Sequence, residues 1–136
     1  MATLSSLGKF KNTGLLLMRI GIGCSFIFLH GYPKLIGGPE TWKMVGQSMG
    51  NLGVDQYPLV WGLAASLVEA VGGALFILGF QFRPICILFA FVMLVASINH
   101  LSSGDGWSTA SHAIEVGLLF IGLLFVGPGK YSVDKH

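Results

Sequence analysis

Four long blocks of apolar residues dominate the chain, near residues 14–36, 57–80, 83–102 and 109–127. Each block has about the 20 residues that a helix needs to cross the hydrocarbon core of a bilayer. Short connections separate the last three blocks, so neighbouring helices are expected to form hairpins. The pattern predicts an all-α fold, a four-helix transmembrane bundle, as a single membrane domain over residues 1–136.

The first connection is the longest and has a helical pattern of its own. Residues 38–40 read Gly-Pro-Glu, which is typical of a helix start, with proline in the first turn followed by an acid. Apolar side chains follow at helical spacing, and Gly50 and Gly53 end the stretch. We therefore expect a short interfacial helix between helices 1 and 2, lying over the mouth of the bundle. The apolar positions are Trp42, Val45 and Met49.

Composition narrows the class of protein. The chain is 53% hydrophobic and only 10% charged, whereas a soluble domain carries about 25% charged residues. The lipid bilayer is therefore the expected environment, and no basic run predicts a nucleic-acid partner. More Lys and Arg residues fall beside the two termini and the connection at Arg83 than on the other side, where Lys34 and Lys43 lie. This bias predicts that both termini are cytoplasmic.

Six ionisable residues lie inside or at the edge of the apolar blocks. Ionisable side chains are expensive in hydrocarbon and usually face a bundle interior or a functional site. Counting the helical rise from the cytoplasmic ends puts the three histidines in one layer toward the outer leaflet, with the two glutamates just beneath. We expect every helix to contribute a polar stripe to one interior pocket. The six residues are Arg19, His30, Glu69, His100, His112 and Glu115.

Two structural interpretations account for these residues without any ligand. Arg19 and Glu69 are expected to form an ion pair between helices 1 and 2, because buried charges often pair in order to be tolerated. The histidines are expected to form interhelical hydrogen bonds with Ser97, Asn99 or Ser108. Lys34, at the end of the first block, is expected to extend its ammonium group to the membrane interface.

A functional interpretation places a quinone ring in the histidine layer. Quinone reduction couples electrons to protons, and the near-neutral pKa of histidine suits proton transfer. We assign proton handling, the catalytic role, to Glu69, His112 and Glu115. The predicted ligand-binding residues, which would hold the quinone, are Arg19, His30, Lys34, Asn99 and His100.

A second functional interpretation is a metal or haem site. Imidazole is the commonest metal ligand, and four-helix bundles can hold metals between inward-facing Glu and His side chains. The histidines available for it are His30, His100 and His112. The order His112-x-x-Glu115 reverses the usual Glu-x-x-His spacing of such sites, so the metal is the weaker alternative.

The chain resembles the DoxX family of small four-helix membrane proteins. The resemblance covers nearly the whole chain and is most specific at the ending 127–134, Gly-Pro-Gly-Lys-Tyr-Ser-Val-Asp. It also includes Arg19 early in helix 1, Arg83 at the start of helix 3, and three further stretches. These are His30-Gly31 followed by Lys34-Leu35, Glu69 with Gly72-Gly73, and Leu78-Gly79.

The resemblance implies a multi-pass protein of the bacterial cytoplasmic (inner) membrane. The relatives that give the family its name are subunits of a thiosulfate:quinone oxidoreductase, which implies an integral component of a redox system with a membrane or soluble redox partner. No separate soluble domain for sulfur chemistry is visible in the sequence. The competing hypothesis is a non-catalytic assembly or scaffold protein, and assembly of several chains into an oligomer stays open.

Overall fold

The computed structural model describes residues 3–135 and is helical throughout its membrane-spanning part. The first span is one continuous helix, Ser5–Ile36, built from four segments. These are a 3₁₀ turn η1 (Ser5–Phe10), α1 (Lys11–Ser25), a π-helical segment η2 (Phe26–Gly31) and α2 (Tyr32–Ile36). The other spans are α4 (Pro58–Leu78), α5 (Phe82–Ser102) and α6 (Gly106–Val126).

The predicted four spans are confirmed, and the described residues contain four helices long and apolar enough to cross a membrane. The last three agree with the sequence prediction within a few residues. The first span begins nine residues earlier than predicted, at Ser5 rather than 14, because the N-terminal helix continues through its polar start. The π-helical turn in the first span was not predicted.

The expected helix in the first connection is also confirmed, as α3 (Gly38–Gly46), followed by a 3₁₀ turn η3 (Gln47–Leu52). It packs closely on the start of α4 through two glycines. A Cβ atom at Gly62 would fall on the carbonyl group of Trp42, and one at Gly46 would fall on the carbonyl group of Pro58. Only glycine allows two backbones to approach this closely, so these residues fix α3 against α4.

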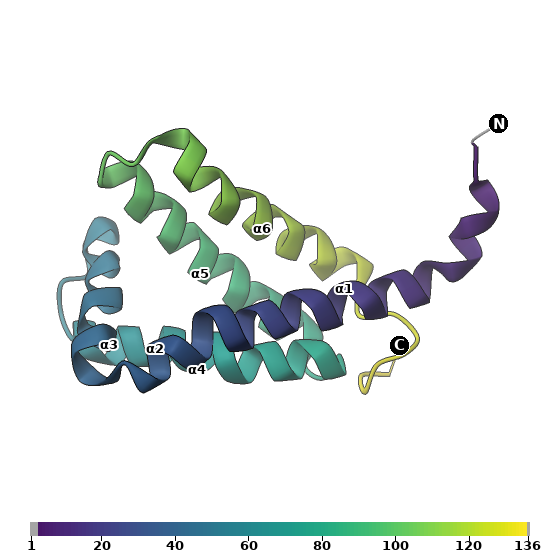
Figure 1. Cartoon of the computed structure of the whole chain (residues 1–136), viewed down its shortest axis with the longest axis horizontal. Helices are drawn as coiled ribbons and strands as arrows, with labels where there is room; N and C mark the ends of the chain where they lie inside the picture. Colours follow the sequence, from purple (N-terminus) through teal and green to yellow (C-terminus); the bar gives the residue numbers. More distant parts are fainter. Residues whose placement is uncertain (1–2, 136) are drawn as a thin grey trace.

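The helices do not lie parallel along their whole length. The hairpin of α5 and α6 diverges from α1 and α4 toward the end of the bundle where α3 lies (Figure 1). At that end η3 contacts both α4 and α5. The short segments α3 and η3 thus connect the two diverging halves.

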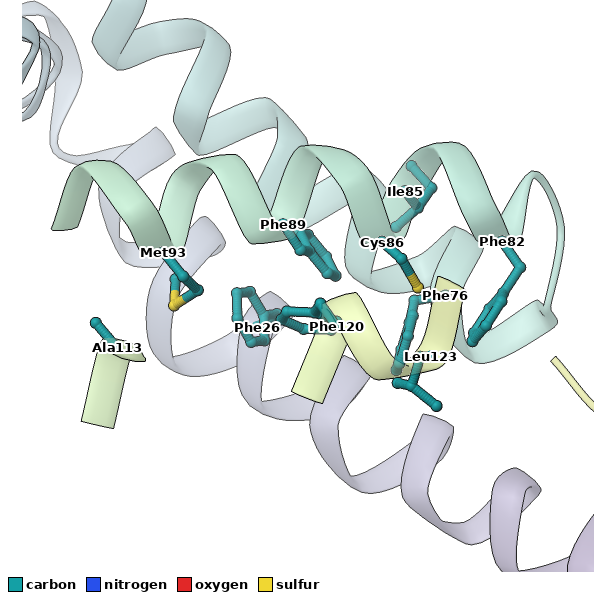
Figure 2. Close-up of a cluster of buried hydrophobic side chains, with 10 residues drawn as sticks. All are labelled: Phe26, Phe76, Phe82, Ile85, Cys86, Phe89, Met93, Ala113, Phe120 and Leu123. Carbon is teal, nitrogen blue, oxygen red and sulfur yellow. The ribbon is translucent and has the colours of Figure 1, made fainter. Parts of the chain in front are cut away.

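Further from the α3 end, an aromatic cluster joins the two halves of the bundle (Figure 2). The rings of Phe26 and Phe89 stack with centroids 4.5 Å apart, and Phe120 of α6 lies 4.8 Å from Phe89. Phe76 of α4 meets Phe120 edge to face at 5.6 Å. Such pairs contribute about 0.5–1.5 kcal/mol each beyond the area they bury. The cluster therefore holds η2, α4, α5 and α6 together. The space between the cluster and the α3 end of the bundle is not part of this aromatic core.

Candidate functional site

A cavity of about 560 Å³ lies between the diverging halves of the bundle, on the side of the aromatic cluster that faces α3 and η3. Its volume falls in the range of small-molecule sites, about 300–1,000 Å³. Phe26, Met93 and Ala113 belong both to the cluster and to the cavity wall, so the cluster forms part of the cavity lining. The remaining walls come from η2, α2, α3, η3, α4, α5 and α6. Most of the lining side chains are apolar, and a few polar groups lie among them: His30, Lys34, Ser48, Glu69, Asn99, His100 and His112.

The strongest polar contact in the wall is an ion pair between Lys34 of α2 and Glu69 of α4. The Nζ atom of Lys34 donates to both carboxylate oxygens of Glu69, at 2.9 Å to Oε1 and 2.8 Å to Oε2. The Glu69 side chain is 2% exposed and that of Lys34 is 29% exposed. The indole Nε1 of Trp42 donates to the backbone carbonyl of Lys34 at 2.9 Å. This hydrogen bond links α2, which carries Lys34, to α3.

This pair corrects two expectations. Glu69 was predicted to pair with Arg19, and Lys34 was predicted to extend away toward the membrane interface. The ammonium group of Lys34 instead reaches inward to Glu69. The small residues beside the acid explain the close approach, because Gly31, which precedes α2, packs against the backbone of Ala70 on α4. Lys34 lies one turn further along and is thereby brought next to Glu69.

Two imidazoles face the cavity without a hydrogen bond from the protein. Neither His30 nor His112 makes a hydrogen bond to any part of residues 3–135. His30 contacts the ring of Phe26, with centroids 5.5 Å apart, and lies within electrostatic range of Lys34, Glu69 and His112. His30 belongs to the π-helical segment η2, and π-helical turns occur frequently at functional sites.

The expected hydrogen bonds from the histidines to nearby serine or asparagine side chains are therefore wrong. Ser97 donates to the carbonyl of Met93, one turn back on its own helix. Asn99 accepts from the side chain of Asn51 at 3.1 Å, which links η3 to α5 at the outer end of the cavity. His100 pairs with Asp105 in the following turn, with Nδ1 and Oδ2 2.9 Å apart. Asn99 and His100 line the cavity from positions that already have protein partners.

Arg19 lies away from the cavity, at the opposite end of the bundle. Its guanidinium group is buried and donates four hydrogen bonds to backbone carbonyls. Two go to Ile77 at the end of α4, one to Pro128 and one to Tyr131 in the C-terminal segment. The structure gives Arg19 a role in fixing the C-terminal segment, and does not bring it to the predicted ligand-binding position.

Glu115 also lies outside the cavity. It follows His112 by three residues on α6, yet it is absent from the cavity wall and is exposed on the outward face of the helix. The core-facing residues of α6, including Ala113, Gly117 and Phe120, are buried on the other side. Of the three residues predicted to handle protons, Glu69 and His112 come together at the cavity and Glu115 does not.

The metal interpretation gains no support from the geometry. Within residues 3–135, no three His, Cys, Asp or Glu side chains are grouped closely enough to hold a metal ion. His100 is instead paired with Asp105, just beyond the end of α5.

Sequence reasoning missed the lining that the first connection contributes. Met44, Val45 and Met49 of α3 and η3 line the cavity, together with Trp61 of α4. The helical spacing of the apolar residues in this connection predicted a covering helix, but did not indicate that it would enter the cavity wall.

Comparison with known proteins places the chain in a family. The DoxX family model matches residues 14–101, which span the first helix to the end of α5. The inner membrane protein YphA of Escherichia coli (strain K12) is 30% identical over 141 residues, covering 95% of this chain and 94% of that protein. The likeness to YphA therefore includes α6, which the family model does not cover. No solved structure matches the chain.

Proposed function

The chain belongs to the DoxX family, and on that premise we propose that it is an integral component of a redox system of the inner membrane that binds quinone in its cavity. The observation that carries this proposal is the unused hydrogen-bonding capacity of His30 and His112, which lie beside the Lys34–Glu69 pair in an otherwise apolar wall. A ligand that suits this wall is apolar with a few hydrogen-bond acceptors, and a quinone ring has two carbonyl oxygens.

Each polar residue has a distinct part in this proposal. The imidazoles of His30 and His112 donate hydrogen bonds to the carbonyl oxygens and orient the ring. Lys34 holds the Glu69 carboxylate beside the ligand, since its ammonium group contacts both carboxylate oxygens. A bound quinone supplies the redox chemistry, accepting two electrons and two protons, and the electrons come from a partner oxidoreductase.

The burial of the Lys34–Glu69 pair supports a proton path in this proposal. Glu69 is buried, and Lys34 is the partly exposed member. In this proposal, protons pass from water on the Lys34 side to Glu69, then to the imidazoles, and from these to the oxygens of a quinone that would be bound there; the ordinary pKa of imidazole, near 6.5, suits both uptake and release. Glu115 has no part in this path.

Quinone content tests the proposal. Protein purified with native lipid is extracted and its quinone is measured against an equal amount of lipid from membranes without the protein. We expect quinone to be enriched, and expect Glu69→Gln to abolish quinone-dependent electron transfer in membranes while the protein still assembles. Glu115→Gln is the matched control and is expected to keep both. A wild-type protein without quinone enrichment would contradict the proposal.

A non-catalytic assembly protein is the second candidate. It is favoured by the way Lys34 and Glu69 satisfy each other and join α2 to α4, which is a sufficient structural role. Under this alternative, Glu69→Gln impairs folding or partner assembly, and any well-folded Glu69→Gln protein supports full electron transfer.

A further inference from the structure

Glu115 has an ionisable side chain in an unfavourable place. It lies nine residues after Gly106 in a helix of 21 residues, which is roughly 14 Å along a hydrocarbon core about 30 Å thick. The side chain is exposed on the outward face and has no hydrogen bond or ion pair with residues 3–135. A carboxyl group near mid-membrane is costly when it faces lipid alone.

The same side of α6 carries small residues beside the exposed apolar side chains of Leu118 and Phe125. Ser108, Ser111 and Gly122 lie on the side of Glu115, opposite the buried residues of the helix. A Cβ atom at Gly122 would meet nothing within 4 Å, whereas one at Gly117 would lie 3.2 Å from Cβ of Met93. The fold of a single chain thus needs Gly117 to be small but gives no reason for Gly122. Small residues with a polar group are typical of helix–helix interfaces in membranes.

We propose that this face of α6 is the interface with a second copy of the chain, and that the dimer buries the two Glu115 side chains against each other. The outward faces of the other spans argue for pairing through α6 itself. Their exposed positions near this depth are apolar, for example Phe28 on the first span, Leu67 on α4 and Phe91 on α5. None of these faces offers a hydrogen-bonding group to Glu115, whereas α6 offers an identical carboxyl group at the same depth.

The symmetry of such a dimer is set by the membrane. Two copies inserted in the same orientation are related by a twofold axis along the membrane normal, so residues at equal depth meet. Two carboxyl groups that meet in a low-dielectric environment share one proton. The protonated Glu115 then donates to the ionised one. Gly122 lies about two turns along the same face, where the absence of a side chain lets the two backbones approach.

Oligomeric state in a bilayer tests this proposal without reference to quinone. The full chain is reconstituted in lipid nanodiscs or vesicles, and its monomer–dimer equilibrium is measured for the wild type and for Gly122→Leu and Glu115→Leu. We expect a dimer for the wild type and at least a tenfold weaker dimer for each variant. Gly21→Leu is the matched control, because Gly21 on α1 is exposed and also has nothing within 4 Å of its Cβ position.

Cross-linking supplies the second measurement. Ser111→Cys is expected to form a disulfide-linked dimer when oxidised in membranes, and Leu17→Cys on the outward face of α1 is not. The native cysteines give the background, since Cys86 is buried and Cys24 is half-buried. A wild-type chain that stays monomeric in the bilayer would overturn the proposal. So would a dimer that Gly122→Leu and Glu115→Leu leave intact, or a monomer that holds a different membrane protein through Glu115.

Discussion

The ammonium group of Lys34 contacts both carboxylate oxygens of Glu69, at 2.8 and 2.9 Å, and this contact joins the end of the first span to the middle of α4. Glu69 is almost completely buried, so Lys34 is the group that makes its charge tolerable. The pair also lies in the wall of the cavity, which means that one contact both stabilises the bundle and sets the electrostatics of the site.

Removing the cation alone is expected to destabilise the protein more than removing both members of the pair. Lys34→Met leaves a buried carboxylate without a partner and is expected to cost about 1–3 kcal/mol, a range reduced because Lys34 is partly exposed. The double variant Lys34→Met/Glu69→Leu is expected to recover most of that loss. Thermal unfolding in one detergent or lipid system measures the difference, and a Lys34→Met protein as stable as the wild type would contradict the assigned pairing.

Arg19 is expected to strengthen the attachment of the C-terminal segment, which Val133 and Asp134 also hold through hydrogen bonds with Leu78, Gly79, Gln81 and Phe82. Arg19→Met removes four hydrogen bonds and leaves the carbonyls of Ile77, Pro128 and Tyr131 without this donor. We expect a loss of about 2–4 kcal/mol, because hydrogen bonds to charged groups are stronger than neutral ones. If the C-terminus is cytoplasmic, as the charge bias of the sequence predicts, the loosened segment is expected to be cleaved faster at Lys130 by trypsin added to inside-out membrane vesicles.

Arg83 provides the control for this prediction. It is an exposed arginine that donates one hydrogen bond, to the carbonyl of Leu124. Arg83→Met is expected to change stability by less than about 1 kcal/mol and to leave cleavage at Lys130 unchanged. If Arg19→Met and Arg83→Met changed stability and cleavage at Lys130 equally, the buried hydrogen bonds of Arg19 would not be what stabilises the C-terminal segment.

Close packing of α3 on α4 is expected to be essential for the cavity. Gly62→Ala places a methyl group on the carbonyl of Trp42, which displaces α3 and costs about 1–3 kcal/mol or more. Gly21→Ala, where a Cβ meets nothing within 4 Å, is expected to be neutral. Stability and quinone affinity of both variants are compared, and a Gly62→Ala protein that behaves like the wild type would contradict the packing described.

The four spans and the interfacial helix could be predicted because both depend on local information, namely the length of the apolar blocks and the spacing of apolar residues. The partners of the charged residues could not be predicted in this way. Estimating depth from the helical rise put Glu69 and the histidines near one level, but it gave no account of which helices approach most closely. Contacts made by Gly31, Gly46 and Gly62 with neighbouring backbones decide that, and they are tertiary features.

The direction in which a side chain points from its helix was harder to predict than its depth along the helix. The π-helical segment η2 has a wider turn than an α-helix, so it changes the angle between residues before and after it. Arg19 and His30 were both expected to face one interior pocket, yet only His30 lines the cavity, and Arg19 binds the C-terminal segment. Similarly, His112 and Glu115 are neighbours along α6, but the core lies on the side that only His112 approaches. The C-terminal residues Pro128 and Tyr131 bind Arg19 across the whole length of the chain, which no local pattern indicates.

Quinone titration followed by tryptophan fluorescence tests the central claim most directly. Of the three tryptophans, Trp61 lines the cavity, whereas Trp42 and Trp107 do not. A short-tailed quinone is expected to quench the wild type saturably, and Trp61→Phe is expected to remove that component. His30→Leu is expected to weaken binding roughly tenfold, as the loss of about 1.4 kcal/mol implies, and Glu115→Gln is expected to bind like the wild type. Non-saturable quenching that is the same for the wild type and His30→Leu would contradict quinone binding in the cavity.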